Sequence, residues 1–95
     1  MAKEITIEKV KRFLRIRHTQ LDEEVADDID ECLADLVSVG VVYPDENDPL
    51  ILAAVKNHAK ASFVEDARES AEFLSRYEKQ KASLMMAEGY GGDHV

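Results

Sequence analysis

The chain has 95 residues, of which 45% are apolar and 34% charged, and its formal net charge is −8. A chain of this size forms one small domain and has no room for separate catalytic and substrate domains. The negative charge argues against general attraction to nucleic acid or to an anionic membrane, and no apolar run approaches the ~20 residues of a membrane span. Cys32 is the only cysteine. An internal disulfide is therefore excluded, and a reducing compartment is expected.

The first predicted helix covers about residues 7–16. Thr6 has the residue type of an N-cap. The apolar positions share one helical face: Ile7, Val10, Phe13 and Leu14. The basic side chains are expected to point outward: Lys9, Lys11, Arg12 and Arg15. Residues 17–20 carry no apolar anchor and are predicted to connect this helix to the next.

The second predicted helix covers about residues 20–39. Thr19 and Asp22 have the spacing of a capping box. The apolar stripe that follows has a helical period: Leu21, Val25, Ile29, Cys32, Leu33, Leu36 and Val37. Gly40 is predicted to end the helix in a left-handed turn, with Val41 folding back toward Leu36. A buried strand over residues 37–43 is a weaker alternative, because no second strand is available to pair with it.

Two further helices are predicted, over about residues 49–64 and 67–87. The segment 43–49 has turn composition and is expected to be exposed, with Asp48 capping the third helix and Pro49 in its first turn. The third stripe contains Ile51, Ala54, Val55, His58, Ala59, Ser62 and Phe63. The fourth helix starts near Asp66 or Ser70 and places Phe73, Leu74, Tyr77, Leu84 and Met85 on one side. With a flexible glycine-containing tail at 88–95, the prediction is a single all-α domain, residues 1–95, of four helices, the first short.

Charge is strongly segregated along the chain. Residues 1–17 carry a net charge of +4, residues 18–48 carry −11 with no Lys or Arg, and residues 49–95 carry −1. Such a run of carboxylates is tolerated best on a solvated face or against a basic surface. The sequence leaves open whether the basic and acidic segments meet within one subunit or between subunits.

No catalytic or metal-binding template fits the sequence. The glycines form no phosphate loop, and Cys32 lies on an apolar stripe, as expected of a core residue. His58 lies on an apolar face and is expected to be a hydrogen-bonded packing residue, and the three histidines have no metal-ligand spacing. A helix-turn-helix that reads DNA is disfavoured, because its recognition helix would be acidic. We therefore expect no enzymatic activity, no cofactor and no metal.

Two stretches resemble a known family. Residues 7–16, with the sequence IEKVKRFLRI, precede a histidine and an acidic run, and this order is similar to the opening of the head-to-tail connector proteins of tailed bacteriophages, also called adaptor or DNA packaging proteins. Residues 56–63 and 73–84, closing on Gly89 and Tyr90, resemble the last two helices and tail of that family. One departure is the segment 65–69, where the family commonly has an Asn-Pro break between these helices. It leaves open whether the two helices are continuous.

The resemblance implies a structural virion protein. Family members form a homo-oligomeric ring, dodecameric on the portal, that extends the DNA channel, helps retain packaged DNA and joins a downstream connector or tail protein. DNA passes through such a ring without sequence-specific binding. The resemblance places the protein at the head-to-tail junction of a phage or prophage virion and in the bacterial cytoplasm during assembly.

Charge segregation suggests a hypothesis for ring closure, in which the first helix of one subunit meets the second helix of the next. The proposed interface residues are Lys11, Arg12, Arg15, Asp27, Asp28 and Glu31. An acidic channel wall that repels DNA is a competing use for the same carboxylates. The alternative function is a small acidic regulatory protein that binds a basic partner with the second helix.

Overall fold

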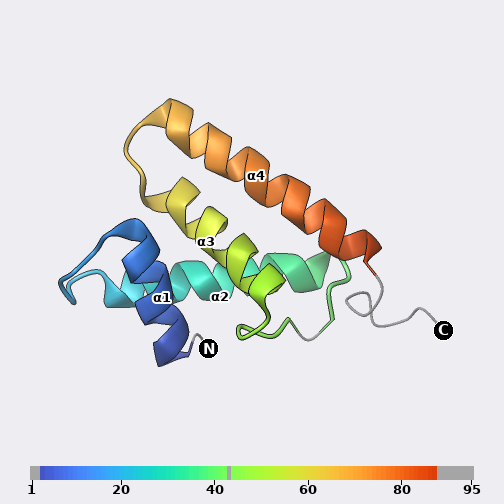
Figure 1. The fold of residues 1–95 in the computed structure, drawn as a ribbon, viewed down its shortest axis with the longest axis horizontal. Helices are drawn as coiled ribbons and strands as arrows, with labels where there is room; N and C mark the ends of the chain where they lie inside the picture. Colours follow the sequence, from blue (N-terminus) through green and yellow to red (C-terminus); the bar gives the residue numbers. More distant parts are fainter. Residues whose placement is uncertain (1–2, 43, 88–95) are drawn as a thin grey trace.

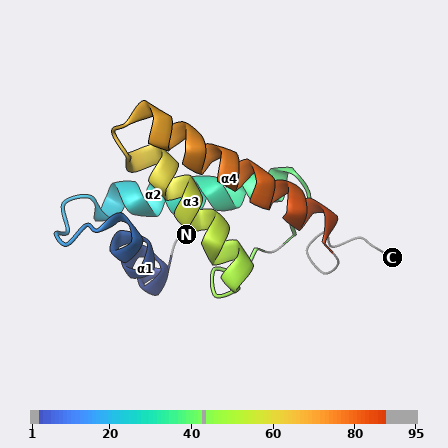
Figure 2. The same ribbon diagram turned by 45° about the horizontal axis from the view of Figure 1, so that its top comes forward.

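In the computed structural model, which describes residues 3–42 and 44–87, the chain forms four helices. They are α1 (Glu4–Leu14), α2 (Asp22–Ser38), α3 (Pro49–Phe63) and α4 (Ala67–Met86). α3 packs against each of the other three, α1 also packs against α2, and α4 packs mainly against α3 (Figures 1 and 2). The predicted all-α domain with a short first helix is confirmed. The tail predicted at 88–95 lies outside the described residues.

α1 begins three residues earlier than predicted, so Thr6 is not its N-cap. The N-cap is Lys3, which makes no capping hydrogen bond through its side chain, while Thr6 is buried within the helix. The reason is a contact far along the chain. The Lys3 amide donates to Oε1 of Glu46 at 2.9 Å, and this contact fixes the start of the helix. Glu46 is consequently buried, contrary to the expectation that the whole 43–49 segment is exposed.

α1 also ends two residues earlier than predicted, without a glycine. Arg15 has a φ of 62°, in the left-handed region, and its amide bonds to the Arg12 carbonyl at 3.2 Å. The Ile16 amide bonds to the Lys11 carbonyl at 2.9 Å. These two bonds are those of a Schellman motif, which satisfies the last carbonyls of a helix. An arginine in this conformation is unusual, because its Cβ crowds the backbone.

The prediction from the sequence is wrong for the start of α2 and correct for its end. The predicted capping box is wrong: Leu21 is the N-cap, no side chain caps the helix, and Asp22 is its first residue. The end at Gly40 is confirmed. Gly40 has a φ of 98°, and the Gly40 and Val41 amides bond to the carbonyls of Val37 and Leu36 at 3.0 Å each. Val41 and Leu36 are both fully buried, as the Schellman motif favours.

α3 and α4 are separate helices that begin alike. Asp48 accepts a hydrogen bond from the Leu50 amide, and Asp66 accepts bonds from the amides of Arg68 and Glu69. Both are therefore N-caps, as predicted for Asp48 and as one of two alternatives for Asp66. The chain is extended at Val64 and Asp66, which separates the two helices. The same segment, 65–69, is where the sequence departed from the connector pattern.

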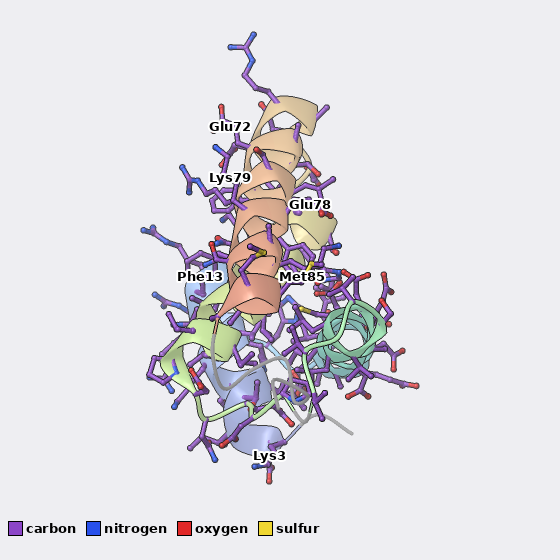
Figure 3. The ribbon with its side chains drawn as sticks, turned by 90° about the vertical axis from the view of Figure 1, so that its right-hand side faces the viewer. Lys3, Phe13, Glu72, Glu78, Lys79 and Met85 are labelled. Atoms are coloured by element: carbon purple, nitrogen blue, oxygen red, sulfur yellow. The ribbon has the colours of Figure 1, made fainter. Side chains whose placement is uncertain are left out.

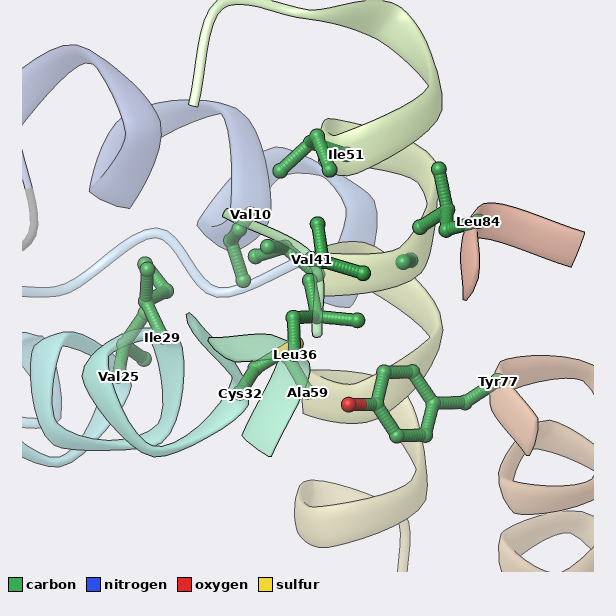
Figure 4. Close-up of a cluster of buried hydrophobic side chains, with 12 residues drawn as sticks. Val10, Val25, Ile29, Cys32, Leu36, Val41, Ile51, Ala59, Tyr77 and Leu84 are labelled. Atoms are coloured by element: carbon green, nitrogen blue, oxygen red, sulfur yellow. The ribbon is translucent and has the colours of Figure 1, made fainter. Parts of the chain in front are cut away.

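The core lies where α1, α2 and α4 meet α3 (Figure 4). Its fully buried members include Val10, Ile29, Leu36, Ile51 and Val55, with Tyr77 and Leu84 supplied by α4. Cys32 is buried among them, as predicted. Burial raises the pKa of its thiol to about 12, which makes it unreactive in the folded chain.

Four large apolar residues predicted to face the core are exposed. Val37 is 54% exposed, Leu74 47%, Met85 44% and Phe13 38%. α4 packs mainly against one helix, so only a narrow strip of its surface, at Tyr77 and Leu84, is buried. Leu36 already fills the core at the end of α2, and Val37, the next residue, is turned about 100° away from it.

Candidate interaction surface

Three carboxylates of α2 bind side chains of other helices in the same subunit. The first is Asp22, whose Oδ1 lies 2.7 Å from Nζ of Lys11 on α1. Oδ1 is buried and makes no further polar contact among the described residues, so it depends on this ammonium group. Lys11 is 4% exposed, which corrects the prediction that it points outward. The hydrogen bond to Asp22 raises the pKa of Lys11 above its ordinary value, so the ammonium group stays charged.

The second is Asp28, which joins α2 to α3. Its Oδ2 lies 3.0 Å from Nδ1 of His58, and its Oδ1 accepts a 2.6 Å hydrogen bond from the Ser62 hydroxyl. Asp28 is 7% exposed. Burial alone would lower the pKa of His58, but the hydrogen bond to Asp28 and the charges of Asp28, Glu31 and Asp35 outweigh burial and raise it. The prediction that His58 is a hydrogen-bonded packing residue is confirmed.

The third is Asp35, which joins α2 to α4. Its Oδ2 accepts a 2.6 Å hydrogen bond from the Tyr77 hydroxyl and a 3.0 Å bond from Nζ of Lys81. These two donors lower the pKa of Asp35 below its ordinary value. Burial, followed by the hydrogen bond to Asp35, raises the pKa of Tyr77, so its hydroxyl stays protonated. The Tyr77 ring also meets the His58 ring edge-to-face at 4.9 Å.

The six predicted interface residues therefore fall into two groups. Lys11 and Asp28 are buried and bind partners inside the subunit, so they are not available to a second subunit. The other four are exposed: Arg12, Arg15, Asp27 and Glu31. The basic first segment and the acidic second one meet within the subunit at the Lys11–Asp22 pair.

Four other carboxylates of α2 face solvent. We call them the α2 acidic face: Glu23, Glu24, Asp27 and Glu31. Within the described part of the chain no ion pair involves any of them. α2 contains no basic residue to neutralise them.

A second surface was not foreseen from the sequence. Phe13 of α1 and Phe73 of α4 meet edge-to-face with ring centroids 6.3 Å apart. Cations surround both rings: Lys56 lies 5.9 Å from the Phe13 centroid, and Lys60 and Arg76 lie 5.8 and 4.7 Å from that of Phe73. We call these five residues the basic-aromatic patch. Phe13 is 38% exposed.

The patch and the α2 acidic face lie on different sides of the molecule. Figure 3 shows Phe13 and Lys79 on the side away from α2, where nitrogen-tipped side chains gather, while oxygen-tipped side chains surround α2. Glu72 lies at the upper rim of the nitrogen-rich side. The basic residues of the patch come from α3 and α4, whose segment 49–95 has a net charge near zero. Because the basic and acidic residues of this segment nearly cancel, a sum of charge along the chain does not reveal this surface.

No group of three or more metal-ligating side chains is present among the described residues. A hollow of about 320 Å³ is lined mainly by the end of α4 and by Leu50. Across the described residues, no helix is both long and apolar enough to cross a membrane.

Comparison with models of protein families, with curated proteins and with solved structures finds no match to this chain.

Proposed function

We propose that this chain is a subunit of the head-to-tail connector of a tailed bacteriophage. In this role it forms a ring under the portal, extends the DNA channel, helps retain packaged DNA and provides the surface to which a downstream connector or tail protein binds. It acts at the head-to-tail junction of the virion after assembly in the bacterial cytoplasm, and performs no chemistry.

One observation carries the proposal beyond the resemblance of residues 7–16, 56–63 and 73–84 to that family. The α2 acidic face and the basic-aromatic patch are opposite in charge and lie on different sides of the molecule. Two different complementary surfaces suit a heterologous contact, in which each copy binds the next and a ring closes if the rotation allows. Exposed ion pairs contribute only about 0 to 1 kcal/mol each, so apolar packing has to supply most of the assembly energy.

A portal-binding measurement tests the proposal. The purified chain is mixed with a portal ring from the same genome, and the particle mass is followed by light scattering and electron microscopy. We expect a larger particle in which copies of this chain form a second ring coaxial with the portal.

The rival functions give different outcomes in the same experiment. If the chain does not bind the portal but forms a defined complex with a basic protein of the same genome, it is the acidic regulator. A chain that shifts labelled duplex DNA in a gel at moderate salt would be a DNA-binding regulator. Either result would replace the connector proposal.

A further inference from the structure

We infer that the basic-aromatic patch is the surface that receives the α2 acidic face of a second copy of this chain. The inference deepens the proposed function and rests on it: it names both halves of the contact between neighbouring subunits. The sequence predicted that the basic first helix of one subunit binds the acidic second helix of the next. The inference keeps α2 as the acidic side but replaces α1 with the basic-aromatic patch, because Lys11 and Asp28 are already bound within the subunit.

The cations of the patch are held in place without a carboxylate partner. Lys56, Lys60 and Arg76 form no ion pair in the part of the chain that the structure describes, and each lies over an aromatic ring instead. Contact with the ring restrains the aliphatic part of a Lys or Arg side chain, while its charged group can still bind an anion. Binding an anion then costs less side-chain entropy than binding by a freely rotating lysine.

The two surfaces also match in spacing. Lys56 and Lys60 are four residues apart on α3, as are Glu23 and Asp27 on α2, and Glu31 continues the acidic row at the same interval. Four residues of helix rise about 6 Å, so two packed helices can place a carboxylate against each lysine in register. Phe13 and Phe73 between the cations supply the apolar area that ion pairs alone lack.

A second copy is favoured over a nucleic acid as the occupant. Phosphates approaching the patch also meet the field of a chain with a net charge of −8. The α2 acidic face, in contrast, is presented by every copy at the same concentration, and three of its carboxylates, Glu23, Glu24 and Asp27, have no partner among the described residues.

Complementary charge reversal tests the inference. The patch variant carries Lys56→Glu and Arg76→Glu, and the α2 variant carries Glu23→Lys and Asp27→Lys. The control carries Arg17→Glu and Arg68→Glu, two exposed arginines outside both surfaces that change the net charge as much as the patch variant. Circular dichroism checks that every variant folds, and sedimentation equilibrium follows association up to about 1 mM chain in about 25 mM salt.

We expect wild type and control to form large assemblies, and each variant alone to associate about twofold to fivefold more weakly per reversed charge pair. An equimolar mixture of the two variants should restore large assemblies in which the two variants alternate. In that mixture the native patch of the α2 variant meets the native acidic face of the patch variant, and the reversed patch meets the reversed face, so both contacts are again opposite in charge.

Several outcomes would overturn the inference. They are a wild type that stays monomeric at the highest concentration, variants that assemble like the control, or a patch variant that loses binding to a DNA duplex while its self-association is unchanged. The proposed function is judged separately by portal binding. Normal portal rings built from either variant alone would remove this interface and leave the connector function standing.

Discussion

His58 holds α3 to two other helices at once. Its Nδ1 pairs with Asp28 of α2 at 3.0 Å, and its ring stands edge-on to Tyr77 of α4 at 4.9 Å. The carboxylates that face it, Asp28, Glu31 and Asp35, all come from α2, and Lys81 of α4 lies on the far side of Asp35. The buried environment therefore favours the imidazolium despite the cost of burying a charge.

This arrangement predicts that stability falls as the pH rises. The pKa of His58 is higher in the folded chain than its unfolded value of about 6.5, so its contribution is complete below that pH and is lost as the pH rises through the folded pKa. Urea unfolding between about pH 5.5 and pH 8 measures this, and we expect the free energy of unfolding to fall over that range. His58→Gln should remove most of the slope, and His18→Gln, at an exposed site, should leave it. Equal slopes in both variants would contradict the assignment.

Long-range contacts of this kind also mark the limit of sequence reasoning at the residue scale. The helical face of His58 and the burial of Cys32 followed from local periodicity. The partners did not, because Asp28 and His58 are 30 residues apart and Asp35 and Tyr77 are 42 apart. Which carboxylates of an acidic run turn inward depends on how the helices pack.

At the scale of single helices, the caps show which local signals suffice. Asp48 and Gly40 act as predicted, because each needs only its own neighbouring amides and carbonyls. Thr6 and the Thr19–Asp22 pair fail, because Glu46 binds the Lys3 amide and Lys11 binds the Asp22 carboxylate. Tertiary contacts override local signals at these two helix starts.

Asp66 gives a direct test of a local cap. Its Oδ1 accepts bonds from the amides of Arg68 and Glu69 at 2.8 and 3.1 Å, and it lies near the positive end of the α4 dipole. We expect Asp66→Ala to lower the free energy of unfolding by about 0.5 to 2 kcal/mol, and Asp66→Asn by much less. Glu65→Ala is the matched control, since its side chain is exposed one position earlier. Chemical denaturation compares the three, and a control as damaging as Asp66→Ala would rule out the cap as the cause.

α4 is joined to α2 at Asp35, which accepts hydrogen bonds from the Tyr77 hydroxyl and from Nζ of Lys81. Tyr77→Phe keeps the ring in the core but removes the 2.6 Å bond to Asp35, so we expect a loss of about 1 to 3 kcal/mol. Lys81→Met removes the other donor to Asp35, whose side chain is 38% exposed, and should cost about 1 kcal/mol or less. A double-mutant cycle on unfolding free energies measures their coupling. Additive losses would show that the two donors act independently.

At the scale of the whole molecule, the charge runs in the sequence predicted that positive and negative charge are unevenly distributed. They located the negative surface but not the whole of the positive one. Most carboxylates of the −11 segment do lie on one acidic helix, α2, and four of them face outward there. The positive surface instead combines single residues from α3 and α4 around Phe13 and Phe73. These residues are up to 63 positions apart in the chain, so only the packing of α1, α3 and α4 brings them together.

Self-association should therefore depend on salt in a characteristic way. Raising sodium chloride from about 25 mM to about 500 mM shortens the screening length from about 20 Å to about 4 Å, which weakens contacts between exposed charges. We expect the assemblies to become smaller in light scattering as chloride rises. Sodium sulfate at equal ionic strength is the informative comparison, because it screens charge similarly but strengthens apolar burial. Assemblies that shrink in chloride and partly recover in sulfate indicate charged contacts around an apolar centre, as Phe13 and Phe73 provide. Assemblies of unchanged size in high chloride would mean that charge plays no part in closing the ring.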